Sequence, residues 1–155
     1  MRTCFLARRA LLALSIPVVL AGCAAGGGTV TKTVVSSPDA PAAIGPYSQA
    51  IKHGSTLYLA GQIAIDPKTS QVNAGSIEDQ TRLVFDNLKA VLAANGMTLD
   101  DVVATTVFMR DLNDFARMNA VYATYFKDKP PARATVQVAR LPRDVAIEIS
   151  ATAAK

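Results

Sequence analysis

An alternation of strand-like and helix-like segments, beginning near residue 48, limits the folds open to this chain more than any other feature of its 155 residues. Two apolar runs flank Gly54-Ser55, a short turn that is typical of a β-hairpin. Later runs rich in β-branched residues alternate with a period of two, as strands with one buried face do. We therefore expect strands at residues 48–53, 56–65, 102–109, 134–138 and 146–153.

Two helices are predicted between these strands. Ser76 with Asp79 three residues later resembles a capping box, and Asn95-Gly96 is a typical end for a helix. A second helix would end before Pro130-Pro131. The order β-β-α-β-α-β-β predicts an α+β fold in which both helices cover one face of the sheet. The residues at helical spacing are Ile77, Thr81, Val84, Leu88 and Val91 in the first helix, and Phe115, Met118, Asn119, Tyr122 and Phe126 in the second.

The amino-terminal segment has the composition of an export signal and not of a folded element. Three arginines without an acidic residue precede an uncharged run at 10–21, which is too short to span a bilayer. One interpretation is an ordinary cleaved signal in which Ala21 and Gly22 serve the peptidase. The alternative, which we favour, is that Leu20-Ala21-Gly22-Cys23 resembles the lipobox of bacterial lipoproteins, whose cysteine is acylated.

This resemblance divides the chain into three parts. Residues 1–22 would be a cleaved lipoprotein signal peptide, residues 23–36 the lipidated Cys23 with a Gly/Ser/Thr tether, and residues 37–155 the folded domain. A first strand could begin near Val34. The resemblance implies an exported protein on the periplasmic side, anchored in the outer membrane since Ala24 stands where an inner-membrane retention signal has Asp. Sec and twin-arginine export both stay open.

Charge and cysteine usage exclude several function classes. The full chain has a formal charge of +4, but without residues 1–22 it retains 13 basic against 12 acidic residues. The basic balance therefore belongs to the signal and does not predict a nucleic-acid partner. Cys4 leaves with the signal and His53 is the single histidine, so cysteine catalysis, Cys- or His-rich metal sites and Ser-His-Asp triads are not expected.

Two charged residues stand out in otherwise apolar strands. Glu148 lies between Ile147 and Ile149, so it points away from the face that carries these isoleucines. Arg133 lies at the start of a strand that is otherwise poor in charge. From the local sequence alone, an exposed residue that has no part in chemistry is the better interpretation of each.

Several motifs follow one another in order over residues 38–153. They are Gly45-Pro46-Tyr47-Ser48-Gln49-Ala50, Ala60-Gly61-Gln62-Ile63, Asp111-Leu112-Asn113-Asp114-Phe115 with Met118-Asn119, Pro131-Ala132-Arg133-Ala134-Thr135-Val136 with Val138-Ala139-Arg140-Leu141-Pro142, and Ile147-Glu148-Ile149. Together these motifs resemble the RidA/YjgF family of enamine/imine deaminases. The resemblance implies a chorismate-mutase-like α+β fold and a homotrimer with ligand clefts between subunits. It also implies hydrolysis of reactive 2-imino acids to 2-keto acids and ammonia, without metal or cofactor.

The same resemblance assigns roles to individual residues. Arg133 would bind the substrate carboxylate, because a guanidinium binds carboxylates bidentately, and Glu148 would orient the attacking water. Tyr47 and Asn119 would line the cleft, although a packing aromatic and a buried helix amide are the plain alternatives. Backbone amides at Gly61 and Thr135 would complete the substrate-binding site.

Three positions depart from active relatives. Ala60 stands where many have Ser, and Ala134 and Thr135 stand where they commonly have Ser and Cys. Because Arg133 and Glu148 are retained, we expect a working deaminase. The alternative is a non-catalytic lipoprotein that binds small carboxylates, or acts as a chaperone, on the same scaffold.

Overall fold

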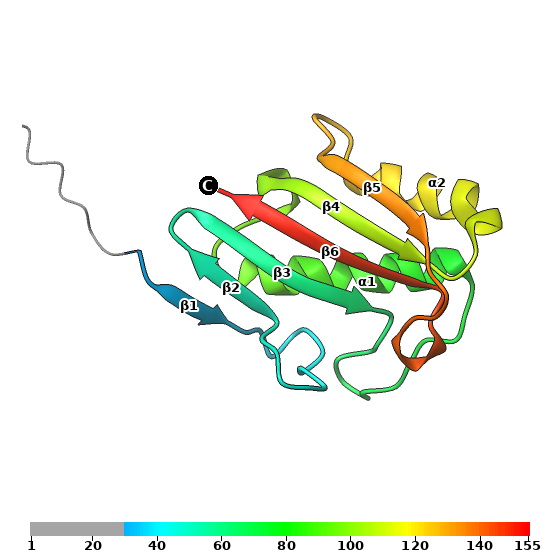
Figure 1. Cartoon of the computed structure of the whole chain (residues 1–155), viewed down its shortest axis with the longest axis horizontal. Coiled ribbons are helices and arrows are strands. Elements are labelled where there is room, and N and C mark those ends of the chain that lie inside the picture. The colour runs from blue at the N-terminus through cyan, green and yellow to red at the C-terminus, as the bar shows by residue number, and fades with distance from the viewer. Residues whose placement is uncertain (1–29) are drawn as a thin grey trace, which may run out of the picture.

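The computed structural model describes residues 30–155. The predicted signal peptide and Cys23, with most of the predicted tether, lie outside these residues. In the view of Figure 1 the helices lie behind the sheet. The elements are, in chain order, β1 (Lys32–Val35), β2 (Ala50–His53), β3 (Thr56–Ile63), α1 (Ile77–Ala93), β4 (Val102–Met109), α2 (Phe115–Tyr125), β5 (Ala132–Gln137) and β6 (Ile147–Ala154).

The sheet is mixed, with the strand order β1-β2-β3-β6-β4-β5. The predicted hairpin forms between β2 and β3, and Gly54 in its turn has a φ of 62°, which favours glycine. β4 and β5 are parallel and connected through α2, whereas the other neighbouring strands are antiparallel. α1 and α2 both pack on one face, so the predicted α+β architecture is confirmed, and within residues 30–155 neither α-helix covers the opposite face (Figure 1).

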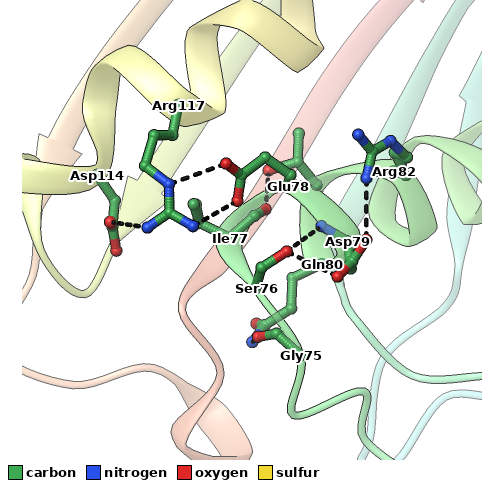
Figure 2. A network of polar contacts seen from close by, with 10 residues as sticks. Gly75, Ser76, Ile77, Glu78, Asp79, Gln80, Arg82, Asp114 and Arg117 are labelled. Carbon is green, nitrogen blue, oxygen red and sulfur yellow. Dashed lines mark hydrogen bonds and ion pairs between the residues drawn. The ribbon is translucent and has the colours of Figure 1, made fainter.

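The start of α1 follows the sequence prediction in part. Ser76 is the N-cap and accepts a hydrogen bond from the backbone N–H of Asp79 at 3.2 Å (Figure 2). The reciprocal half of a capping box is absent here, because the Asp79 carboxylate accepts from the Ser76 hydroxyl instead. Nearby, the Arg117 guanidinium contacts both Glu78 carboxylate oxygens at 2.7 and 2.8 Å, which ties α2 to α1 on the exposed side (Figure 2).

The carboxyl end of the predicted tether overlaps a strand, close to Val34, where a first strand was considered. Lys32–Val35, which the composition placed in residues 23–36, form β1 and pair with β2 in register Val35↔Ala50. The strand is favoured because Val35 is buried in the main core while the backbone of β2 gains hydrogen-bond partners. The residues that pack with the domain therefore begin before residue 37.

Strand boundaries also place one candidate differently from the sequence analysis. β5 begins at Ala132, so Arg133 lies inside a strand and not at its start. In β3 the register shifts between Leu59 and Gln62, where Ala60 and Gly61 face a single residue of β6. This irregularity is a β-bulge, which redirects the side chains beside it.

Residues 30–155 contain no helix long and apolar enough to cross a membrane. No group of three or more His, Cys, Asp and Glu side chains within that range is placed to hold a metal ion.

Candidate functional site

Arg133 lies on the face of the sheet that the helices cover. It is opposite Thr105 in the parallel pairing of β5 with β4, and the Thr105 hydroxyl contacts the Tyr122 hydroxyl of α2 at 2.8 Å. One Arg133 nitrogen, Nη2, donates to Asn119 Oδ1 at 2.8 Å. Within the described part of the chain no carboxylate pairs with Arg133, whereas Arg82, Arg117 and Arg140 each form an ion pair. Its remaining N–H donors are therefore suited to an external carboxylate.

Glu148 lies on the opposite, helix-free face. Its neighbours Ile147 and Ile149 are fully buried in the main core under the helices, and successive strand residues point to opposite faces. Glu148 is opposite Phe108 of β4 and Ile63 of β3. Burial raises the pKa of Glu148 above its ordinary value, because the charged carboxylate loses solvent.

A hollow of about 410 Å³ opens beside the Glu148 carboxylate. Apart from that carboxylate and the tyrosine hydroxyl, the side chains that line the hollow are apolar. Ala60 contributes a methyl group at the position noted above as one where many active relatives have Ser. A carboxylate with a raised pKa in such surroundings is suited to accepting a proton from a bound water. The lining residues are Ile44, Tyr47, Ala60, Gly61, Ile63, Pro142 and Glu148.

Gly61 leaves the space that the Glu148 side chain occupies. A Cβ built on Gly61 would overlap the carboxylate oxygen of Glu148, and would also lie 2.8 Å from its Cδ atom. The glycine is therefore required for the observed Glu148 position, in addition to any role of its backbone amide.

Replacing Gly61 with alanine is expected to displace the Glu148 carboxylate and lower kcat/KM for an imine substrate about 10²-fold, the usual cost of misplacing a reacting group. Steady-state assays of the folded variant test this. Gly45→Ala is the matched control, because its Cβ would make an ordinary 3.5 Å contact with the Tyr47 ring. A Gly61→Ala enzyme as active as the control would show that Glu148 does not need its present position.

Tyr47 extends over the same hollow from the loop before β2. Its side chain is half exposed, and its hydroxyl accepts a hydrogen bond from the Ile44 N–H at 3.2 Å. Gln49, which belongs to the quoted motif but was given no role, fastens this loop: its buried amide bonds to the backbone of Ser37, Ala40 and Pro41. The signal in the sequence was a polar residue next to an apolar strand. In the structure the Gln49 side chain holds the loop that carries Tyr47.

Thr135 belongs to the Arg133 group, since it lies two residues further along β5 and opposite the buried Val107. Its hydroxyl is buried and has no hydrogen-bond partner within residues 30–155. The predicted contribution of its backbone amide to ligand binding stays a prediction.

The structure thus brings the candidates together in two groups and not in one. Arg133, Asn119 and Thr135 lie on the helix-covered face, whereas Tyr47, Gly61 and Glu148 surround the hollow on the open face. Because the sheet separates the groups, one copy of the chain does not present Arg133 and Glu148 to the same ligand. Sequence reasoning also missed the aromatic surroundings of Arg133, where the Tyr122 and Phe115 rings lie beside the guanidinium.

Comparisons with known proteins agree with the fold and the motifs. The family model described as Endoribonuclease L-PSP matches residues 37–155. A RutC family protein of Pyrococcus horikoshii is 56% identical over 124 residues, which are 80% of this chain and 98% of the relative. The 2-iminobutanoate/2-iminopropanoate deaminase of Mus musculus is 43% identical over 81% of this chain and 93% of its own length.

A solved structure gives the same result for the fold. The crystal structure of E. coli TdcF with bound serine superposes with a TM-score of 0.76 at 42% identity, over 79% of this chain and 98% of that chain. The match of the family model to most of the chain, together with these identities, shows the family. The chain belongs to the Endoribonuclease L-PSP family, which is the RidA/YjgF family that its motifs resemble.

Proposed function

We propose that this protein hydrolyses 2-imino acids to 2-keto acids and ammonia. The observation that carries the proposal is that the chain contains two complementary groups. One is an arginine whose contacts are neutral and which has N–H donors without a partner in residues 30–155, and the other is a carboxylate of raised pKa in an apolar hollow. A relative that is 43% identical bears the name of a 2-iminobutanoate/2-iminopropanoate deaminase. The two groups match the carboxylate and the electrophilic carbon that such a substrate presents.

The chemistry needs a bound water and no covalent nucleophile. Arg133 binds the substrate carboxylate through two N–H donors, which places the imine carbon. Glu148 accepts a proton from water as the water oxygen bonds to this carbon and the C=N electron pair moves to nitrogen, and Glu148 then passes this proton to the nitrogen. Glu148 next accepts the proton of the new hydroxyl group and delivers it to the nitrogen as the C–N bond breaks, so that the C=O bond of the keto acid forms and ammonia leaves.

We propose that the complete site forms between two copies of the chain in a homotrimer. The Arg133 group and the Glu148 group occupy different faces of one subunit, so each can meet its complement on a neighbour. Such a head-to-tail contact closes into a ring when the rotation between subunits permits it, as three-fold symmetry does. Each trimer would then contain three equivalent sites.

A coupled assay tests the reaction itself. An amino-acid oxidase generates 2-imino acids in the presence of semicarbazide, which traps the imine as a measurable adduct. Added protein is expected to reduce adduct formation in proportion to its concentration while keto acid and ammonia appear. Unchanged adduct formation with every imine tested, combined with tight binding of a 2-keto acid, would favour the non-catalytic alternative.

We further propose that the protein is exported and anchored to a membrane through acylated Cys23. The support is the uncharged run before the Leu-Ala-Gly-Cys sequence and the composition that follows it. Expressed in a Gram-negative host, the protein is expected in the outer-membrane fraction with the mass of an acylated Cys23 terminus.

Replacing Cys23 with serine removes the acylation site, so the variant is expected to leave the membrane fraction. Membrane fractionation followed by mass spectrometry measures this. Cys4→Ser, which alters the predicted signal without touching the acylation site, is the control and should behave as the parent. Equal membrane association of the Cys23→Ser protein would contradict the lipid anchor.

A further inference from the structure

Arg133 rests on an aromatic surface contributed by α2. Its Cζ atom lies 4.3 Å from the centroid of the Tyr122 ring and 5.7 Å from that of Phe115. Asn119, which accepts the guanidinium hydrogen bond, comes from the same helix face, because positions 115, 119 and 122 are spaced by one or two helical turns. Guanidinium groups are attracted to the faces of such rings.

The Tyr122 ring is itself fixed in orientation. Its side chain is 5% exposed, and its hydroxyl shares a 2.8 Å hydrogen bond with that of Thr105, which is also buried. Phe85 packs edge-on against the ring with centroids 5.3 Å apart, and Phe126 packs against it at 4.9 Å. Turning the ring would leave two buried hydroxyls without partners, which is unfavourable.

The contacts around Arg133 are electrically neutral. An amide oxygen and two rings hold the guanidinium, and no carboxylate of residues 30–155 pairs with it. Burial also raises the pKa of Tyr122, so its phenol stays neutral. A carboxylate in this place would offset the positive charge of the guanidinium. Neutral contacts instead fix the position of the guanidinium while its positive charge stays available to attract a ligand carboxylate.

We propose that Tyr122, oriented by Thr105, is a positioning residue that holds the Arg133 guanidinium in the plane needed for a ligand carboxylate. This inference rests on the proposed function, in which Arg133 binds the substrate carboxylate. Tyr122 touches the arginine and not the reacting atoms. Its contribution should therefore vanish when Arg133 is absent.

A double-mutant cycle on the full-length protein tests this dependence. Calorimetric titration with 2-oxobutanoate gives Kd for the parent, Tyr122→Leu, Arg133→Ala and the double variant, and denaturant unfolding reports their stability. Tyr122→Leu is expected to weaken binding about tenfold in the parent and by less than twofold in the Arg133→Ala background. Tyr122→Phe keeps the ring face and is expected to bind within about threefold of the parent.

Each outcome bears on the inference. A folded Tyr122→Leu protein that binds 2-oxobutanoate like the parent would overturn the inference. So would a Tyr122→Leu substitution that weakens binding by the same factor in the Arg133→Ala background, because a structural effect on the site does not depend on the arginine.

If the Tyr122→Leu protein does not fold, the Thr105→Val variant tests the inference instead. It is expected to weaken binding severalfold and to be rescued by adding Tyr122→Phe, which removes the unpaired hydroxyl; parent-like binding by Thr105→Val would overturn the inference. If Arg133→Ala itself binds 2-oxobutanoate like the parent, the proposed carboxylate clamp is wrong irrespective of Tyr122.

Discussion

Replacing Arg133 with alanine is expected to lower kcat/KM for a 2-imino acid by about 10²- to 10⁴-fold. The variant loses two charge-assisted hydrogen bonds to the substrate carboxylate, each of which contributes about 1.5–3 kcal/mol. Most of the loss should appear in KM, and in the Kd of a 2-keto acid, because the guanidinium binds a group that does not change during the reaction. Steady-state assays with the oxidase-coupled system and direct titration measure the two quantities.

Arg133→Lys provides a graded comparison. It retains a positive charge but lacks the planar pair of donors, so its activity is expected between those of the parent and Arg133→Ala. Arg82→Ala is the control for removing an arginine, since Arg82 pairs with Asp79 on the surface of α1. An Arg133→Ala enzyme with the activity of the Arg82→Ala enzyme would contradict the assigned role.

Replacing Glu148 with glutamine is expected to reduce kcat about 10²- to 10⁴-fold, with a smaller change in KM. The substitution preserves size and hydrogen-bonding reach, but an amide does not accept a proton from water. Titration of 2-oxobutanoate should therefore give a Kd close to that of the parent. Loss of binding and of turnover in equal measure would instead assign Glu148 to substrate binding.

The pH dependence supplies a second measurement on Glu148. The ionised carboxylate is the form that accepts a proton, and burial raises the pKa of Glu148. As the pH is lowered, activity should therefore begin to fall at a higher pH than it would with a glutamate of ordinary pKa.

The raised pKa of Glu148 also affects stability, because the protonated carboxyl group is favoured in the folded state. The stability that this protonated group contributes is lost as the pH rises through the raised pKa. At pH 7 the neutral Glu148→Gln variant should accordingly be at least as stable as the parent, and the difference should shrink in acid. A more acid-sensitive Gln variant would contradict this assignment.

Much of the fold followed from local sequence pattern. The strands that alternate apolar and polar residues were predicted within a few residues, because one face of each packs on α1 and α2. β1 was anticipated only as a strand that could begin near Val34, because Lys32 and Thr33 continue the threonine-rich composition of the predicted tether and the strand depends on its pairing with β2 at the edge of the sheet. Edge strands gain their stability from a neighbour, which a local pattern does not record.

The candidate site was predictable as a set of residues but not as an arrangement. The two-residue period of β6 correctly placed Glu148 on the face of the sheet away from Ile147 and Ile149. The side of the sheet taken by Arg133 depends on the parallel register of β5 with β4, which is a long-range property. The same holds for the ring of Tyr122 beneath the guanidinium and for the bulge that brings Gly61 to the Glu148 carboxylate. The separation of the two groups onto opposite faces was therefore visible only in the structure.

That separation is the reason for proposing that Arg133 of one subunit acts together with Glu148 of another. Co-expression of Arg133→Ala and Glu148→Gln copies with different tags, followed by tandem purification, yields mixed trimers. Tandem purification retains only trimers that contain both variants, and in each of these about a third of the contacts, one of three, joins an intact arginine to an intact glutamate. The mixed protein is expected to regain imine hydrolysis at about a third of the parent activity, although each variant alone is nearly inactive. Mixed trimers that are as inactive as the separate variants would show that both residues must come from one chain.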